Sequence, residues 1–389
     1  MKRAAAIALA LLGVVAACSD SSSSSPTSPA AVTSAPAIEV STTAAPPTSD
    51  ATTTLSPTTV ATTTTTVPIA AWQQVTAPSQ CMCADGSPYS YWVHQGDPTK
   101  VVFFLQGGGA CFDATTCAFD SNTYRVKLGA ADDPNTFTSG VFDFTDPRNP
   151  LGDYSFVFAP YCTGDVHLGT ATHVYGPQLT VQHKGSFNAT AALDDLATHF
   201  PNATQIVVAG ESAGSAPTPL YAGLAHDLLP NADITVLADG SGAYPDVPAV
   251  NGLIGQLWGV ADAIPLWPEN SGLTAADFSL PGLLVQANKH DPDIIFGRHD
   301  YAFDAVQKLF AGLAGFPADD LVSLIDANET EIEKGGVDLH SYISPGQSHT
   351  VLSKPEFYTE TVEGVPLVDW VSDLIRRQPD LDVHCTDCT

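Results

Sequence analysis

Residues 205–214, which read QIVVAGESAG, decide how this chain is expected to fold. The apolar, β-branched run at 205–209 is typical of a buried strand, and it passes directly into Gly210-Glu211-Ser212-Ala213-Gly214. Apolar residues at helical spacing follow over 220–229. A strand, a sharp glycine-flanked turn and a helix leave the hydroxyl of the central serine exposed. This context predicts that Ser212 is a nucleophile; the alternative is a structural loop rich in glycine and serine.

The same alternation of strand-like and helix-like patterns continues along the chain. Strands are predicted at 101–105, 155–159, 205–209, 234–238, 283–287 and 339–344, and helices at 186–200, 220–229, 301–316 and 367–376. Such alternation is typical of an α/β protein with a mostly parallel central sheet and helices on both faces. Residues 240–280 are rich in glycine and proline and contain Trp258 and Trp267, so a lid-like insertion is expected there. We expect these tryptophans to be packing residues, with stacking on a sugar or lining of an acyl pocket as the alternative.

A serine nucleophile needs a general base and an acid that orients the base. In a strand–turn–helix scaffold the acid and the histidine follow the serine in that order, in loops at the carboxyl ends of later strands. His349 follows the last predicted strand in a loop with proline and glycine, and it is the predicted base. Asp291 follows the strand predicted before it and is the predicted acid. Asp293 and Asp239 remain alternatives.

Attack by a serine places negative charge on the former carbonyl oxygen, which preorganised backbone amides stabilise. We expect one donor from Ala213 and a second from Gly107-Gly108-Gly109, where glycine permits close approach of the backbone. No lysine or ribose-binding acid follows this glycine run at the spacing of a phosphate-binding motif. The histidines near the candidate acids lack metal-site spacing. Neither a metal nor a cofactor is therefore expected.

The N-terminus reads as an export signal. Two basic residues precede an apolar run at 4–17, which is too short to span a bilayer and suits a signal peptide. Its end, Val15-Ala16-Ala17-Cys18, resembles the bacterial lipoprotein signal; an ordinary secretory signal is the alternative. We expect a signal peptide over 1–17, a lipidated Cys18 that begins a disordered Ser/Thr/Pro/Ala-rich linker over 18–70, and one folded domain over 71–389. The predicted location is the outer face of the cell membrane.

The charge of the chain excludes one class of partner. It has 14 basic and 42 acidic residues, which gives a formal net charge of −28. The basic residues are scattered and form no stripe that would neutralise phosphates, so a nucleic-acid partner is not expected. An acidic surface also repels other polyanions.

Six short motifs carry a resemblance to a known family. They are CADGSPY at 83–89, LQGGGACF at 105–112, PYCTGD at 160–165, GESAG at 210–214, ADGSG at 238–242 and Ser348-His349. Together they resemble the pectin acetylesterase/Notum family of α/β-hydrolases, over a stretch from about residue 72 to about residue 352. The resemblance implies an α/β-hydrolase fold and a carboxylic-ester hydrolase with Ser212, Asp291 and His349 as its triad. It also implies that Gly108 and Gly109 share the oxyanion hole with Ala213.

Two residues depart from the family pattern. Gly109 stands where plant and animal members usually have an aromatic residue, and Glu211 stands where cysteine or serine precedes the nucleophile. The substrate therefore does not carry over with the fold. We expect removal of short, acetyl-type acyl groups by a monomer, with acetylated carbohydrate as one candidate, because the acidic domain would repel de-esterified pectin. The alternative is a non-catalytic cell-surface binding protein on a hydrolase fold.

Seven cysteines remain besides Cys18. Cys111 and Cys117 are close enough in sequence to staple the loop beyond the glycine run, and the resemblance implies that Cys83 pairs with Cys162.

The last three cysteines allow two arrangements. Cys81 bonds to Cys385 or Cys388, or those two bond to each other and Cys81 stays reduced. Zinc binding by these three together with Cys83 fits the spacing, but disulfides are favoured in an exported chain.

Overall fold

The computed structural model describes residues 71–389 except 317, 380–381 and 389. The predicted signal peptide over 1–17, the lipidation of Cys18 and the linker to residue 70 lie outside the described residues and stay predictions. None of the helices in the described part of the chain is both long enough and apolar enough to cross a bilayer.

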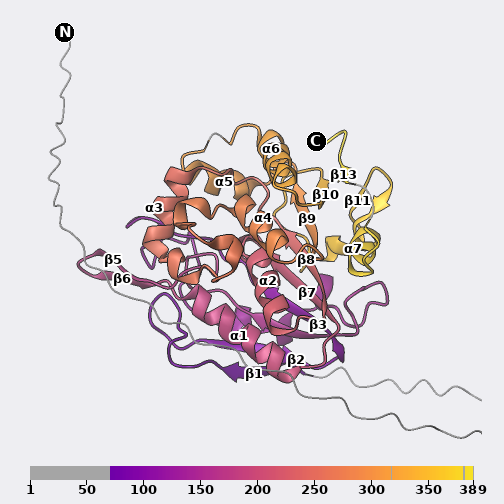
Figure 1. Ribbon diagram of the computed structural model, residues 1–389, viewed down its shortest axis with the longest axis horizontal. Helices are drawn as coiled ribbons and strands as arrows, with labels where there is room; N and C mark the ends of the chain where they lie inside the picture. Colours follow the sequence, from indigo (N-terminus) through magenta and orange to yellow (C-terminus); the bar gives the residue numbers. More distant parts are fainter. Residues whose placement is uncertain (1–70, 317, 380–381, 389) are drawn as a thin grey trace, which may run out of the picture. The chain divides into compact units, whose positions relative to one another are not determined.

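A nine-stranded sheet forms the centre of the domain (Figure 1). Its order is β1-β2-β4-β3-β7-β8-β9-β10-β13. The strands from β4 to β13 are parallel, and β1 and β2 add an antiparallel edge. The bounds are β1 Gln73–Thr76, β2 Ser90–His94, β3 Asp97–Leu105, β4 Tyr154–Ala159, β7 Gln205–Glu211, β8 Asp233–Asp239, β9 Ile295–Tyr301, β10 Leu339–Ser344 and β13 Val383–His384.

Helices cover both faces of this sheet. They are α1 Gly185–His199, α2 Thr218–Leu228, α3 Pro248–Trp258, α4 Leu280–His290, α5 Ala305–Leu313, α6 Leu321–Lys334 and α7 Leu367–Ile375. Two small hairpins lie outside the sheet, β5 Thr172–Gly176 with β6 Leu179–Gln182 and β11 Thr361–Val362 with β12 Val365–Pro366.

Successive side chains of the central strands enter two different cores, because a strand alternates its faces. Val101 and Phe103 pack with residues of α1, α2, α4 and α6. Val102 and Phe104 pack on the other face with residues of α7, including Trp370. Since both faces are buried, the strands read as continuous apolar runs, as is typical of parallel sheets.

The structure confirms five of the six predicted strands, and the one at 283–287 is wrong. Those residues lie inside α4, which begins after Ser279; the hydroxyl of Ser279 accepts a hydrogen bond from the amide of Gly282, and Pro281 occupies the first turn. The strand of this unit is β9 instead, which carries Arg298, His299 and Asp300 in a fully buried position. The four predicted helices are present as α1, α2, α5 and α7.

The segment predicted as a lid contains α3 and several short 3₁₀ helices. Both of its tryptophans are buried. Nε1 of Trp258 donates to the carbonyl of Cys111 at 2.8 Å, and Nε1 of Trp267 donates to Asp227 at 2.7 Å. Trp267 also stacks on His290, with ring centroids 4.1 Å apart. Packing therefore accounts for both tryptophans, as predicted, and Trp258 also lines a cavity described below.

The expected disulfides are present. Cys83 bonds to Cys162, and Cys111 bonds to Cys117. For the three cysteines left open, Cys385 bonds to Cys388, and Cys81 is a buried free thiol.

Candidate active site

Ser212 lies at the turn between β7 and α2 with a φ of 54°, a left-handed value that few residues other than glycine adopt. The glycines around it are needed for close packing: a Cβ on Gly210 would collide with the carbonyl of Gly214, and one on Gly214 with the carbonyl of Leu105. A strained backbone at a partly exposed serine between a strand and a helix is the geometry of a nucleophile elbow. The structure thus places Ser212 as the sequence predicts.

The partner of His349 is Asp304. Nδ1 of His349 donates to Oδ2 of Asp304 at 2.6 Å. A proton on Nδ1 leaves Nε2 of the neutral ring as an acceptor. Nε2 is buried and makes no hydrogen bond to the described residues. His349 therefore presents the atom that a general base needs, held by a carboxylate on its other side.

Asp304 is fully buried and fixed by backbone and side-chain donors. It is the N-cap of α5, where Oδ1 accepts hydrogen bonds from the amides of Val306 at 2.8 Å and Gln307 at 3.0 Å. The side chain of Gln307 donates to Oδ2 at 3.2 Å. The start of a helix also favours a negative charge. These contacts hold the carboxylate in one orientation toward His349.

The prediction of Asp291 as the acid is wrong in its geometry. Asp291 caps the carboxyl end of α4, and its Oδ2 lies 3.0 Å from Nδ1 of His226. Asp291 and Asp293 precede β9, whereas Asp304 follows it. A seven-residue strand is about 20 Å long, so Asp291 and Asp304 lie near opposite ends of β9. Because the sequence predicts the strand at 283–287 instead of at β9, the acid is expected in the loop before β9 and not in the loop after it.

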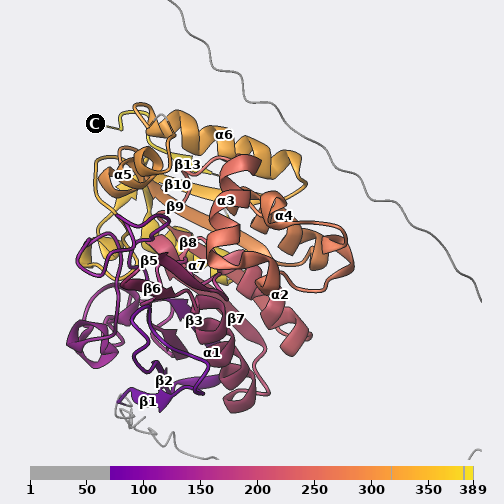
Figure 2. The ribbon, with the colours of Figure 1, turned by 90° about the vertical axis from the view of Figure 1, so that its left-hand side faces the viewer.

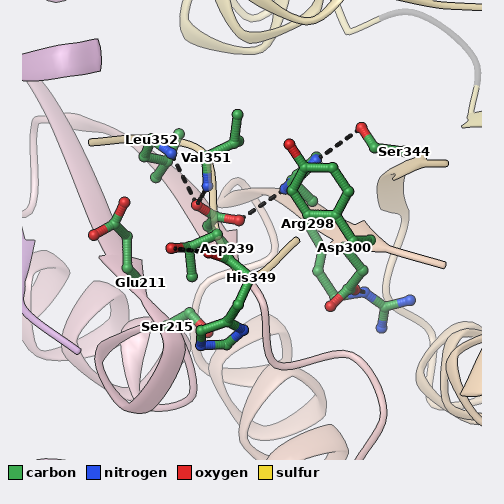
Figure 3. A network of polar contacts seen from close by, with 12 residues as sticks. Glu211, Ser215, Asp239, Arg298, Asp300, Ser344, His349, Val351 and Leu352 are labelled. Carbon is green, nitrogen blue, oxygen red and sulfur yellow. Dashed lines mark hydrogen bonds and ion pairs between the residues drawn. The ribbon is translucent and has the colours of Figure 1, made fainter. Parts of the chain in front are cut away.

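Asp239, the other alternative for the acid, binds the backbone of the loop that carries His349 and not the side chain of His349. Glu211 binds the same loop (Figure 3). Oδ2 of Asp239 accepts from the amides of Val351 at 2.7 Å and Leu352 at 2.9 Å. Oε1 of Glu211 accepts from the next amide, that of Ser353, at 2.7 Å. Glu211 and Asp239 are neighbours in register at the ends of β7 and β8. We call this arrangement the carboxylate clamp.

The clamp brings two carboxylates together, and this changes the titration of one of them. Burial, and then the charge of Asp239, raise the pKa of Glu211 to about 7, although the hydrogen bonds from Ser353 and the charge of Lys354 oppose the rise. Lys354 also donates through Nζ to the carbonyl of His349. The sequence marked Glu211 as unusual before a nucleophile, but nothing local in it indicates that Ser353 is its partner.

A second Ser-His-Asp series lies beneath the clamp and is sealed from solvent. Nδ1 of His299 lies 2.7 Å from Oδ1 of Asp239, and Nε2 of His299 lies 3.0 Å from the hydroxyl of Ser344. All three side chains are fully buried. The series joins the ends of β8, β9 and β10 and supports Asp239 in the clamp.

Two cavities meet at Ser212. One, of about 150 Å³, is lined by apolar groups of α3, α5 and the loop after the glycine run, among them Phe112, Ile254, Trp258 and Phe310. The other, of about 500 Å³, is the more polar of the two: it contains His349, Glu211, Arg125 and several hydroxyl groups, together with four phenylalanines. Ser212 and Gly109 line both cavities, and His349 lines only the polar one. Ser212 thus lies between an apolar cavity and a more polar one.

The expected oxyanion residues surround the same point. Gly107, Gly108 and Gly109 line the polar cavity beside Ser212, and Ala213 lines the apolar one. Gly109 has a φ of 79°, and a Cβ there would collide with the carbonyl of Thr123, so glycine is required. The structure brings these residues together around Ser212.

Metal-ligating side chains gather at two places in the described part of the chain. The first is Cys111, Cys117 and His183, whose cysteines form a disulfide. The second is Glu329, Glu333 and Asp382, which line neither cavity at Ser212.

The comparisons with known proteins agree with this geometry. The sequence model of the pectinacetylesterase family matches residues 60–255, about half of the chain. The chain belongs to the pectinacetylesterase family. The match includes the glycine run and Ser212, whereas Asp304 and His349 lie beyond it.

Two known proteins and one solved structure are similar to this chain. The palmitoleoyl-protein carboxylesterase notum1a of Danio rerio is 29% identical over 151 residues, which are 38% of this chain and 30% of that protein. The inactive palmitoleoyl-protein carboxylesterase notum1b of the same species is 30% identical over 100 residues, 25% of this chain and 72% of that protein. The structure of the Wnt deacylase Notum from Drosophila matches with a TM-score of 0.61 and 16% identity, over 82% of this chain and 97% of the other.

These similarities confirm the predicted family and the α/β-hydrolase fold. The chain spans less than a third of the length of notum1a. The names of the family and of its relatives support a carboxylic ester hydrolase.

Proposed function

We propose that this protein is an exported serine esterase in which Ser212, His349 and Asp304 form the catalytic triad. The observation that carries the proposal is the position of Ser212 on a strained elbow at the junction of an apolar and a polar cavity, with His349 on the polar side. An ester has an acyl part and an alcohol part, and the apolar and the polar cavity can each hold one of them.

The reaction follows from the side on which each group lies. Nε2 of His349 takes the proton of Ser212 as its oxygen attacks the carbonyl carbon of the ester. Amides of Gly108, Gly109 and Ala213 stabilise the oxyanion. The carbon–oxygen bond to the alcohol then breaks, and His349 returns the proton to the departing alkoxide in the polar cavity. Water attacks the acyl-enzyme with the same histidine as base, and the acid and free serine result.

The apolar cavity supports an acyl group longer than the acetyl group predicted from the sequence. Its volume of about 150 Å³ matches an engineered apolar cavity in another protein that binds benzene, so a chain of about six carbons has room there. Gly109, which replaces the family's aromatic residue, lines this cavity. The polar cavity, with hydroxyls such as Thr136 and Ser139, suits a hydroxyl-rich alcohol, including a carbohydrate.

Lipid anchoring through Cys18 stays part of this proposal and rests on the sequence alone. Three disulfides in the described residues suit a chain that leaves the cytoplasm.

The test is hydrolysis of p-nitrophenyl esters from acetyl to decanoyl by the full chain and by Ser212→Ala. We expect kcat/KM to be highest for chains of about six carbons and to fall by about 10⁴-fold or more in the variant. A fluorophosphonate should label Ser212, as identified by mass spectrometry. Ser215→Ala is the matched control, because that hydroxyl donates to the carbonyl of Ser212 and lines neither cavity at it. Equal activity of the Ser212 variant and the parent would contradict the assignment of Ser212 as the nucleophile. If the parent hydrolyses none of the esters, a binding function is favoured.

A further inference from the structure

Exposed leucines are next in sequence to residues that line the apolar cavity, on two of the helices that form it. Ile254 of α3 and Phe310 of α5 face the cavity. The residue before each of them, Leu253 and Leu309, is 61% and 58% exposed. One residue on a helix turns the side chain by about 100°, so both leucines lie beside the cavity wall and point outward. Leu313, one turn after Leu309, is 42% exposed. We call these three side chains the leucine rim.

Charged residues are almost absent from the helices that carry the rim. Residues 247–260, which include all of α3, contain no charged residue, and α5 contains only Lys308. Elsewhere the domain is strongly acidic: residues 71–389 hold 39 of the 42 acidic residues and 12 of the 14 basic ones. Figure 2 shows both helices in the upper half of the domain, and residues of both line the apolar cavity.

An uncharged apolar rim on an acidic domain restricts the partner that fits it. Exposed leucines gathered beside a cavity indicate an interaction site, because exposed apolar side chains are costly in water. An anionic surface is repelled by the rest of the domain, whereas a neutral or zwitterionic lipid layer accepts the leucines without opposing charge. Lys308 beside Leu309 is exposed and suits contact with lipid phosphate.

We propose that the leucine rim docks the domain on a neutral or zwitterionic lipid surface, with the apolar cavity facing the acyl chains. Docking itself does not require hydrolysis; its link to substrate supply rests on the esterase proposed above. A chain leaving the lipid layer would enter the cavity between α3 and α5 and reach Ser212 without crossing water. The lipid anchor predicted at Cys18 would keep the domain close to such a surface.

The test measures binding to vesicles of phosphatidylcholine by sedimentation. The full chain carries Ser212→Ala, so that binding is separate from hydrolysis, and Cys18→Ala, so that the anchor is absent. In this background Leu253→Gln/Leu309→Gln is expected to lower the partition coefficient about tenfold or more, because both leucines leave water on docking. Thermal unfolding of each variant confirms that it is folded.

The matched control is Leu228→Gln/Leu266→Gln. These leucines are 41% and 101% exposed and do not line the apolar cavity. The control should bind within about twofold of the parent. Adding phosphatidylglycerol should weaken binding at low ionic strength, and salt should restore it, because the acidic domain is then screened.

Three results would overturn the proposal. The rim variant binds like the parent, the two double variants lose binding equally, or the parent fails to bind vesicles and forms a dimer that the rim variant does not form in sedimentation velocity. The last result would assign the rim to a second copy of the chain. A protein that binds through the rim and shows no esterase activity would keep the docking and refute the esterase.

Discussion

Replacement of Asp304 by asparagine distinguishes the acid that we propose from the one predicted from the sequence. The two oxygens of Asp304 have different partners. Oδ1 accepts from two amides at the start of α5, and Oδ2 accepts from His349 and from the side chain of Gln307. Asparagine offers one oxygen and one NH₂ group, so one pair of partners must lose its acceptor.

The two orientations of the asparagine allow an estimate of the loss. With its oxygen at the helix start, its NH₂ faces Nδ1 of His349, which then gives up its proton, and Nε2 carries the proton instead. That tautomer cannot accept the proton of Ser212. The reversed orientation loses two hydrogen bonds at the helix start, each worth about 1–2 kcal/mol, so about one molecule in 100 would keep the productive tautomer. Loss of the charge that stabilises the imidazolium lowers the rate further. We expect kcat to fall about 10³–10⁴-fold, which corresponds to about 4–5 kcal/mol.

The assay is hydrolysis of a p-nitrophenyl ester by Asp304→Asn, with Asp291→Asn as the control. The control makes the same chemical change at a carboxylate that contacts His226 instead of His349. We expect it to keep kcat within about threefold of the parent. If Asp304→Asn keeps more than about a tenth of the activity, or if Asp291→Asn loses as much as Asp304→Asn, the assignment of the acid is refuted.

Three further changes test the clamp, the cavity and the buried charges. Glu211→Gln should flatten the pH dependence of stability. The raised pKa of Glu211 contributes to the free energy of unfolding of the parent fully below pH about 4.5, and this contribution is lost as the pH rises through about 7. Urea denaturation should therefore show that the free energy of unfolding of the parent falls by roughly 2–3 kcal/mol between pH 5 and pH 8, and that the variant lacks this fall. Ile254→Trp should fill the apolar cavity and lower kcat/KM for hexanoyl esters about tenfold while acetyl esters change less than threefold; equal losses would place the acyl group elsewhere. Arg298→Met should cost about 3–5 kcal/mol in urea denaturation, because it leaves the buried carboxylates of Asp300 and Glu329 without their cation, and a loss below 1 kcal/mol would contradict that pairing.

The sequence predicts the nucleophile and the base because their signals are local. The turn at 210–214 needs its glycines within a few residues of Ser212. His349 follows β10, where Leu339, Tyr342 and Ile343 give the sequence enough strand-forming apolar residues for the strand to be predicted. The sheet and most of its flanking helices could be predicted for the same reason.

The acid could not be found in this way, because β9 does not look like a buried strand. Arg298, His299 and Asp300 occupy its centre, and their burial depends on partners far away in sequence: Glu329 for Arg298, and Asp239 for His299. The run at 283–287 looks more like a strand than β9 does. The cap at Ser279 and Pro281 indicates a helix at 280–290 instead. The helix predicted at 301–316 includes Asp304, but aspartate favours the position before a helix, and in the structure α5 begins directly after it.

In the proposed mechanism, the position of Ser212 between two cavities also sets the routes by which the products leave. The alcohol would depart from the polar cavity while the acyl group is still bound to the serine, and the attacking water would arrive through the space that the alcohol has vacated. An added small alcohol should therefore compete with water for the acyl-enzyme and yield a new ester, whereas an added fatty acid should compete with the substrate for the free enzyme. The two products would thus inhibit in different ways, one by reversing a step and the other by filling a site.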